Sequence, residues 1–179
     1  KVTAILNITP DHLNRHHTME AYIKAKEDIT MNQTKDDVCV LNYEDEVLRK
    51  FADDCNAKVV FFSSARVLDE GFYLDGDTIY YAHEGRTDLI IDVNELNLLG
   101  KHNYENVMAA CAITVNFGVP LDKIIEILHV FTAVEHRIEY VTEKRGVKFY
   151  NDSKGTNPDA AIQGIRAMNR PTMLIGGGY

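Results

Sequence analysis

Short β-rich runs alternate with segments of helical periodicity in the N-terminal part of the chain. The runs at residues 2–8, 38–41 and 58–62 are rich in branched and aromatic residues, and helical patterns at residues 19–31 and 45–55 lie between them. Strands that alternate with helices in this way form a parallel sheet with crossover helices. The alternation therefore predicts an α/β fold, and the first helical pattern predicts a buried stripe of Tyr22, Ala25 and Ile29.

The period of the apolar residues changes to two after residue 71. Phe72 and Leu74 lead into Asp75-Gly76, a strong hairpin signal, and a further strand is expected at residues 89–93. The predicted sheet is therefore mixed, though mainly parallel. Two helices should follow, and their expected core-facing positions are Val107, Ala110, Cys111, Thr114 and Phe117 in the first and Leu121, Ile124, Ile125 and Leu128 in the second.

The pattern of the sequence changes again after Phe131, from helical spacing to a hairpin. A second hairpin is expected about Arg145-Gly146, followed by a helix at residues 158–168 and a strand at residues 172–175 that runs into three glycines. We therefore predict a domain boundary near Ala133, which divides the chain into residues 1–132 and 133–179.

Composition narrows the class of protein. The 179 residues are 45% hydrophobic, enough for a real core, and no apolar run approaches the roughly 20 residues of a membrane span. Without a signal pattern at the N-terminus, a cytoplasmic location is expected. The net charge of −8 argues against a general nucleic-acid binder, and the three widely spaced cysteines are expected to be buried thiols.

The chain opens without methionine and stops after a predicted strand, so both ends are expected to be cut.

The loop after the first strand holds an acid and several imidazoles. His12 stands where open α/β sheets place ligands, although a loop histidine is more often a solvated side chain. His12 and His16 have the i,i+4 spacing that could grip zinc on a helix, but Pro10 and the polar run that follows favour a loop. Lys26 follows Ala25 on the predicted stripe, and by pattern alone its ammonium should reach water.

Two further segments put polar side chains before a helix. Asn103 and Asn106 share a face of a first helical turn, where the free N–H groups favour anions, although a simple N-cap by Asn103 fits equally well. Residues 151–158 (NDSKGTNP) place an acid, a cation and hydroxyls between a strand and a helix, which is also ordinary capping chemistry. No phosphate loop is present, because the only Gly-Lys pair, Gly100-Lys101, is followed by His102.

Read in order, five of these segments resemble the Mur ligases almost from end to end. They are residues 6–13 (LNITPDHL), 22–26 (YIKAK), 100–106 (GKHNYEN), 131–139 (FTAVEHRIE) and 151–157 (NDSKGTN). Each is degenerate, but the ordered set is specific. The Asn-Asp-Ser-Lys motif that ends at Lys154 resembles the D-glutamate-adding members most, with Gly155 in place of a common alanine.

The resemblance implies the second half of a central ATPase domain followed by the start of a Rossmann-like domain for the incoming amino acid. It also implies a reaction of peptidoglycan synthesis, in which ATP with Mg²⁺ phosphorylates the carboxylate of UDP-N-acetylmuramoyl-L-alanine and the amine of D-glutamate attacks the acyl phosphate. A monomer is favoured for the full-length enzyme. The 179 residues alone should be inactive, because they lack the phosphate loop.

The resemblance also implies roles for individual residues. His12 would bind one magnesium ion, and Lys26 would be carbamylated to give a second oxygen-bearing ligand, which reverses the interpretation from pattern alone. Asn103 and Asn106 would face the adenine, and Arg137 and Asp152 would contact the ribose or phosphates. The residues expected on the acyl-acceptor and D-glutamate side are Lys154, which would also be catalytic, and Thr156.

Other functions remain open on the sequence. A ligase that adds glutamate to folate, or another Mur-type amide ligase, is the nearest enzymatic alternative. A nucleotide-binding module without chemistry is the second. The third is a zinc hydrolase using His12, His16 and His17, although His16 and His17 have no role that the resemblance assigns.

Overall fold

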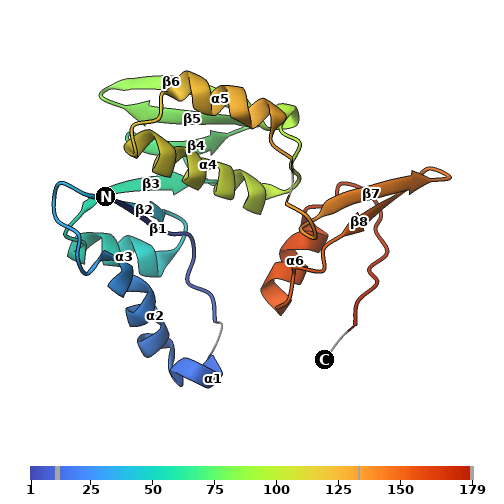
Figure 1. Cartoon of the computed structure of the whole chain (residues 1–179), viewed down its shortest axis with the longest axis horizontal. Coiled ribbons are helices and arrows are strands. Elements are labelled where there is room, and N and C mark those ends of the chain that lie inside the picture. Colours follow the sequence, from blue (N-terminus) through green and yellow to red (C-terminus); the bar gives the residue numbers. More distant parts are fainter. Residues whose placement is uncertain (11–12, 133, 178–179) are drawn as a thin grey trace.

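The computed structural model describes residues 1–10, 13–132 and 134–177. A six-stranded sheet with helices on both faces occupies the larger part, and a two-stranded hairpin with one helix forms the smaller part that follows it along the chain (Figure 1). The predicted α/β class, with a mixed and mainly parallel sheet, is confirmed.

The sheet has the order β1-β2-β3-β4-β5-β6. Strands β1 (Val2–Ile5), β2 (Val38–Asn42), β3 (Lys58–Ser63) and β4 (Gly71–Asp75) are parallel, whereas β5 (Thr78–His83) and β6 (Arg86–Asp92) are antiparallel to their neighbours. The expected hairpin turn lies between β4 and β5, where Gly76 has a φ of +57° that a glycine adopts without steric cost.

Two pairs of helices cover the sheet. Helix α2 (Met19–Glu27), continued by the 3₁₀ turn η1 (Asp28–Thr30), lies with α3 (Glu46–Asp54) over one face. Helices α4 (Lys101–Asn116) and α5 (Leu121–Val130) cover the other face, after the 3₁₀ turn η2 (Val93–Glu95) (Figure 1). None of the helices in the described part of the chain is long and apolar enough to cross a membrane.

Strand β2 shows why the sheet needs helices on both faces. Cys39 and Leu41 belong to the core under α2 and α3, whereas Val40, between them, belongs to the core under α4 and α5, and all three are fully buried. Successive side chains of a strand point to opposite faces, so an unbroken apolar run is stable only between two helical layers. This explains the continuous apolar runs that predicted the parallel strands.

The smaller part consists of β7 (Glu139–Lys144) and β8 (Val147–Asn151), paired antiparallel, and α6 (Pro158–Arg166). Helix α6 begins as capping rules predict: Asn157 accepts a hydrogen bond of 2.8 Å from the backbone N–H of Ala160, and Pro158 occupies the first turn. The predicted boundary residue, Ala133, lies outside the described residues, so the division at that point stays a prediction.

Two predicted helical stripes were partly wrong. In α2 only Tyr22 is buried, because the helix packs on the sheet through Met19, Tyr22 and Ile23. Ala25 of the same helix and Ile29 of η1 are exposed. The predicted stripe of α4 included Ala110 and Phe117, but both are exposed. Phe117 is the residue that ends the helix, and the residues of α4 that cover the sheet are Val107, Met108, Ala109, Cys111 and Ala112.

Two local predictions were also wrong. Residues 172–175 do not form a strand, because no strand of the described chain lies beside them, and Met173 and Ile175 are about nine-tenths exposed at 87% and 90%. The polar run after Pro10, expected as a loop, contains a single helical turn, α1 (Leu13–His16), closed by a 2.8 Å hydrogen bond from the N–H of His17 to the carbonyl of Leu13.

The expectation of buried thiols is confirmed for Cys39 and Cys111, whereas Cys55 is half-buried. Burial raises the pKa of Cys39 to about 11 and the pKa of Cys111 to about 12. Because the thiolate is the reactive form, we expect iodoacetamide at pH 8 to alkylate only Cys55 in the folded chain. Peptide mass spectrometry after quenching measures this, and alkylation of Cys39 or Cys111 at the rate of Cys55 would contradict it.

Candidate functional site

A cavity of about 230 Å³ lies beyond the carboxyl end of β1, where the chain leaves the sheet. Its walls come from both parts of the molecule: Asn7 and Thr9 after β1, Lys26 on α2, the first turns of α4, and residues between 137 and 164. Open α/β sheets bind ligands at the carboxyl ends of their parallel strands. The cavity therefore lies where the fold favours a ligand site.

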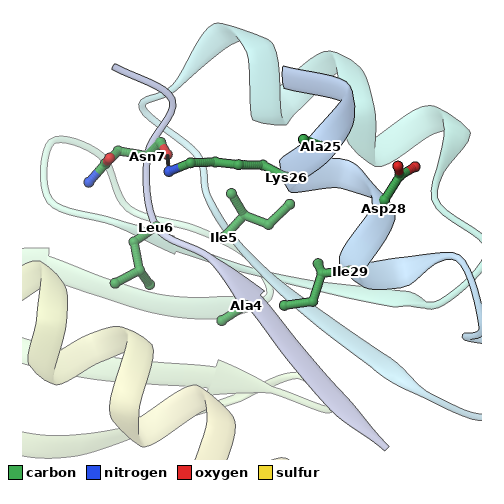
Figure 2. Close-up of a pocket in the computed structure, with 8 residues that line it drawn as sticks. All are labelled: Ala4, Ile5, Leu6, Asn7, Ala25, Lys26, Asp28 and Ile29. Atoms are coloured by element: carbon green, nitrogen blue, oxygen red, sulfur yellow. Dashed lines mark hydrogen bonds between the residues drawn. The ribbon is translucent and has the colours of Figure 1, made fainter. Parts of the chain in front are cut away.

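Lys26 reaches from α2 across to the segment after β1, as Figure 2 shows. Its Nζ donates to the backbone carbonyl of Asn7 at 3.3 Å and lies 5.0 Å from the centre of the Tyr22 ring. A second and more open hollow, of about 700 Å³, shares Lys26 and Asn7 with the first. The lysine is half-buried and held between the two hollows, so it does not simply extend into water.

The start of α4 contributes an amide to the cavity. Asn106 lines it, whereas Asn103 is 6% exposed and donates a 2.7 Å hydrogen bond from Nδ2 to the carbonyl of Leu99. The N-cap of α4 is Gly100, so the interpretation of Asn103 as an N-cap was wrong. Gly100 has a φ of +93°, and a Cβ there would lie 2.5 Å from the Cβ of Ala167, so a glycine is required on both counts.

The smaller part of the molecule contributes two charged side chains to the cavity wall, the guanidinium of Arg137 and the carboxylate of Asp152. The carboxylate of Asp152 accepts a 3.1 Å hydrogen bond from the N–H of Ile138 through Oδ1, which joins the end of β8 to the start of β7. Its other oxygen lies against α6, where a Cβ on Gly164 would stand only 2.4 Å away. The absence of a side chain at Gly164 thus makes room for this carboxylate.

Other predicted site residues lie elsewhere. Lys154 and Thr156 are exposed in the turn after β8 and do not line the cavity. The turn is held by backbone hydrogen bonds, from the N–H of Lys154 to the carbonyl of His136 at 2.9 Å and from Thr156 to Lys154 at 3.0 Å. His12 lies outside the described residues. The cavity therefore brings together Lys26, Asn106, Arg137 and Asp152.

Sequence reasoning missed His102 and Glu105, which also line the cavity. Burial lowers the pKa of His102, and the nearby Arg137 guanidinium lowers it further, so this imidazole is neutral near pH 7. Glu105 accepts a hydrogen bond from Ser64 at the end of β3. Both residues stand in the 100–106 segment that was singled out, and their spacing of three on one helical face was the signal available. Gln163 and Gly164 of the cavity wall carried no such signal.

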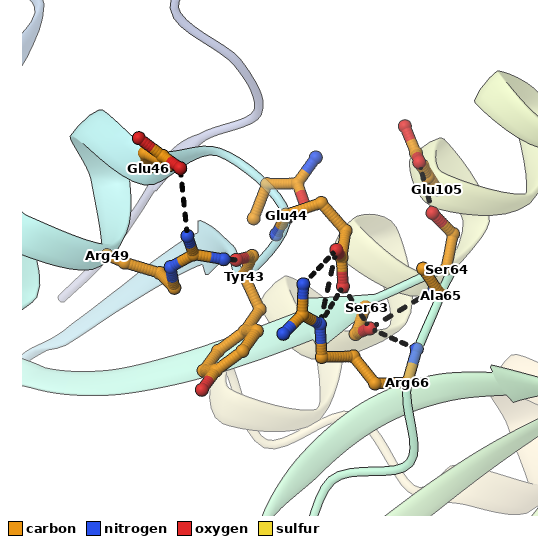
Figure 3. A network of polar contacts seen from close by, with 10 residues as sticks. Tyr43, Glu44, Glu46, Arg49, Ser63, Ser64, Ala65, Arg66 and Glu105 are labelled. Carbon is orange, nitrogen blue, oxygen red and sulfur yellow. Dashed lines mark hydrogen bonds and ion pairs between the residues drawn. The ribbon is translucent and has the colours of Figure 1, made fainter.

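A polar network lies beside the cavity at the ends of β2 and β3 (Figure 3). Glu44 accepts hydrogen bonds from the Ser63 hydroxyl at 2.7 Å and from the Arg66 guanidinium at 3.1 Å. Burial acts to raise the pKa of Glu44, but these bonds outweigh it and lower the pKa. The network keeps Glu44 ionised and fixes the segment after β3 that carries Ser64. Among the described residues, no group of three or more His, Cys, Asp or Glu side chains could hold a metal ion.

Residues 1–114 match the model of the Mur ligase middle domain. The chain is 61% identical over 99% of its length to the UDP-N-acetylmuramoylalanine--D-glutamate ligase of Lachnoclostridium phytofermentans, of which it covers 39%. It is 49% identical to the enzyme of that name from Clostridioides difficile, again over 99% of the chain and 39% of the relative. The chain thus spans about two-fifths of the curated relatives that it matches.

Solved structures agree in fold. The crystal structure of the MurF ligase from Thermotoga maritima in complex with ADP matches 93% of the chain with a TM-score of 0.65 and 21% identity, and the chain covers 38% of it. A MurF structure from Acinetobacter baumannii matches 90% of the chain with a TM-score of 0.69 and 19% identity, with 36% of that structure covered. The cavity lies in a fold shared with these ligases. The chain belongs to the Mur ligase family, and residues 1–114 are its middle domain.

Proposed function

We propose that this chain forms the nucleotide-facing wall of an ATP-dependent ligase that adds D-glutamate to UDP-N-acetylmuramoyl-L-alanine in peptidoglycan synthesis. The observation that carries the proposal is the 61% identity, over 99% of the chain, to relatives that bear this name. A phosphate loop absent from these residues would come from another part of the complete protein. Its absence here is why we expect the 179 residues alone to be inactive.

The proposed reaction proceeds in two steps. A carboxylate has no usable leaving group, so its oxygen attacks the γ-phosphorus of ATP, ADP leaves, and an acyl phosphate forms. The amine of D-glutamate then attacks the acyl carbon, phosphate departs with the C–O electron pair, and the amine loses a proton as the amide forms. The residues of the cavity would bind and orient the nucleotide, since holding reactants in place supplies much of the acceleration in phosphoryl transfer.

The lysine in the cavity wall fits a role in metal binding only after modification. A free ammonium repels Mg²⁺, which prefers oxygen ligands. In the proposed modification the neutral Lys26 amine forms a C–N bond to CO₂ and releases one proton, which leaves a carbamate with two oxygen acceptors. Its place in the wall, with Glu105 nearby, supports this role, and His12 would supply another ligand. Magnesium bound there would neutralise phosphate oxygens during transfer.

The remaining roles are assigned by position. Asn106 and Asn103 would face the adenine, with the Asn103 amide already fixed by Leu99. Arg137 and Asp152 would contact the ribose and phosphates, a role supported by their position in the cavity wall. Lys154 and Thr156 would contact the acyl acceptor and D-glutamate, which their exposure on the turn after β8 allows.

Gly164 provides a prediction about nucleotide binding. Alanine at this position of α6 should push the Asp152 carboxylate from its place, since the added Cβ would lie 2.4 Å from Oδ2. We expect Gly164→Ala to weaken ADP binding by the complete protein roughly tenfold, the effect of one lost hydrogen bond to a charged group. The substitution should leave stability nearly unchanged, because the roughly 1 kcal/mol that a helical alanine gains over glycine offsets the loss of the hydrogen bond from Ile138 to Asp152, which is of similar size.

Isothermal calorimetry with ADP measures this effect, and a double substitution provides the control. In an Asp152→Ala background, Gly164→Ala should cause no further loss of affinity, since the displaced group is gone. Equal losses in both backgrounds would show that Gly164 acts independently of Asp152.

The proposed activity is tested with the complete protein, ATP, Mg²⁺ and a panel of amino acids, with UDP-N-acetylmuramoyl-L-alanine as the acceptor in one series and a folate in a second. Phosphate release and the mass of the product are followed together. We expect a new amide with D-glutamate and none with L-glutamate, L-lysine or D-alanine. A product formed only with a folate acceptor would identify the folylpolyglutamate type of ligase instead. Tight ADP binding without any product would identify a binding module.

A further inference from the structure

A single peptide group, the one that joins Asn7 to Ile8, is held at both ends by charged side chains. Its carbonyl oxygen accepts from the Nζ of Lys26 at 3.3 Å, and its N–H donates to Oδ2 of Asp45 at 2.7 Å. The two atoms belong to one rigid plane, since the peptide bond does not rotate freely. Fixing the direction of the N–H therefore fixes the direction of the carbonyl that Lys26 contacts.

Asp45 is itself firmly anchored. Its other oxygen, Oδ1, caps α3 by accepting from the N–H groups of Val47 at 2.9 Å and Leu48 at 3.2 Å. The Leu48 side chain is fully buried in the core between α3 and the sheet. The carboxylate thus connects the start of a core helix to a loop segment 37 residues earlier in the chain. An N-cap needs only one oxygen, so the bond to Ile8 is an additional function of this side chain.

We propose that Asp45 is a positioning residue for Lys26. By holding the N–H of Ile8, it turns the carbonyl of Asn7 toward α2 and so keeps the Lys26 nitrogen at the mouth of the cavity. A carbamylated lysine retains one N–H on this nitrogen, so the same carbonyl can orient the modified side chain. The orientation of a carbamate at Lys26 by this carbonyl rests on the proposed function. The position of the unmodified Lys26 amine does not depend on that function.

The substitution Asp45→Asn separates the two functions of the side chain. Asparagine caps helices as well as aspartate does, so its oxygen can keep the bonds to α3. Its NH₂ group would then face the N–H of Ile8, donor against donor, and the peptide group would lose its fixed direction. A matched control is Asp92→Asn, which changes the carboxylate that caps η2 and accepts from Asn94 at 2.8 Å, away from the cavity.

Lysine labelling of the complete, folded protein measures the effect directly. In bicarbonate-free buffer without nucleotide or metal, each lysine is acetylated with a limiting reagent and quantified by mass spectrometry. We expect Asp45→Asn to raise the relative rate at Lys26 roughly three- to tenfold, the effect of losing one hydrogen bond. Lys24 and Lys50 should be unchanged in both variants. The amide proton resonance of Ile8 should move upfield in Asp45→Asn only.

An unchanged Lys26 rate together with a shifted Ile8 resonance would overturn the proposal, because Asp45 would then hold the loop without positioning the lysine. The reciprocal variant, Lys26→Met, provides a test if Asp45→Asn does not fold. It should shift the Ile8 amide resonance from the carbonyl side of the same peptide group, and an unmoved resonance would equally overturn the proposal. None of these measurements depends on ligase activity. The positioning role of Asp45 can therefore be disproved while the proposed ligase function stands, and the ligase function can be disproved while the positioning role stands.

Discussion

Lys26→Met should lower kcat/KM of the complete ligase by roughly a thousandfold, because a correctly held metal ion contributes several kcal/mol to the stabilisation of the transition state. Methionine keeps the length of the side chain but cannot form a carbamate. It also removes the contact with the carbonyl of Asn7. Steady-state assays of phosphate release with D-glutamate measure the loss.

Lys24→Met is the matched control, because Lys24 lies on the same helix but is 72% exposed and forms a surface ion pair of 3.2 Å with Asp28. Such pairs are worth at most about 1 kcal/mol, so activity should stay within about threefold of the parent protein. A folded Lys26→Met enzyme that keeps more than about a tenth of the parent activity would contradict the assigned role, since that loss is far smaller than metal removal requires.

Phe72→Ala should lower the free energy of unfolding by about 3–5 kcal/mol, the usual cost of emptying a large aromatic site in a core. Phe72 is fully buried on β4 and stacks on Tyr81 of β5 at 4.2 Å between ring centres. Its loss would leave a cavity beneath α4 and weaken the pairing of the two strands. Urea unfolding of the 179-residue chain, followed by circular dichroism, measures the change.

Phe117→Ala removes the same atoms from a residue that is 67% exposed at the end of α4. Surface substitutions of this kind usually change stability by about 0.5 kcal/mol or less. The difference between the two variants should therefore exceed roughly 2 kcal/mol, given these ranges. Equal losses would show that Phe117 belongs to the core after all, as its spacing on the helix had predicted.

The order and type of the elements could be predicted because local signals and burial agree there. Asp45 and Asn157 begin helices that their side chains cap, and Gly76 forms the turn that its sequence context demands. Errors arose where a contact outside the local pattern decided the outcome. Ile29 has helical spacing but lies in the 3₁₀ turn η1, where it borders the open hollow beside β1 and stays 53% exposed. Residues 172–175 have strand composition but no neighbouring strand in the described chain.

The candidate site was predictable only in part. The sequence segments identified Lys26, Asn106, Arg137 and Asp152, and the structure places them in one cavity wall. The sequence alone could not reveal that Gly164 makes room for the Asp152 carboxylate, or that Asp45 and Lys26 hold the same peptide group. These relations depend on the path of the backbone between residues far apart in the chain, which local periodicity does not encode.

Carbamylation of Lys26 can be observed directly by ¹³C NMR of the complete protein in ¹³C-bicarbonate. A carbamate at Lys26 predicts a single resonance in the carbamate region that disappears in Lys26→Met, persists in Lys24→Met and broadens when Mn²⁺ replaces Mg²⁺. The same resonance should weaken when bicarbonate is removed, in parallel with ligase activity. A fully active enzyme with no such resonance, and with Lys26 unmodified, would show that Lys26 does not act as a carbamate.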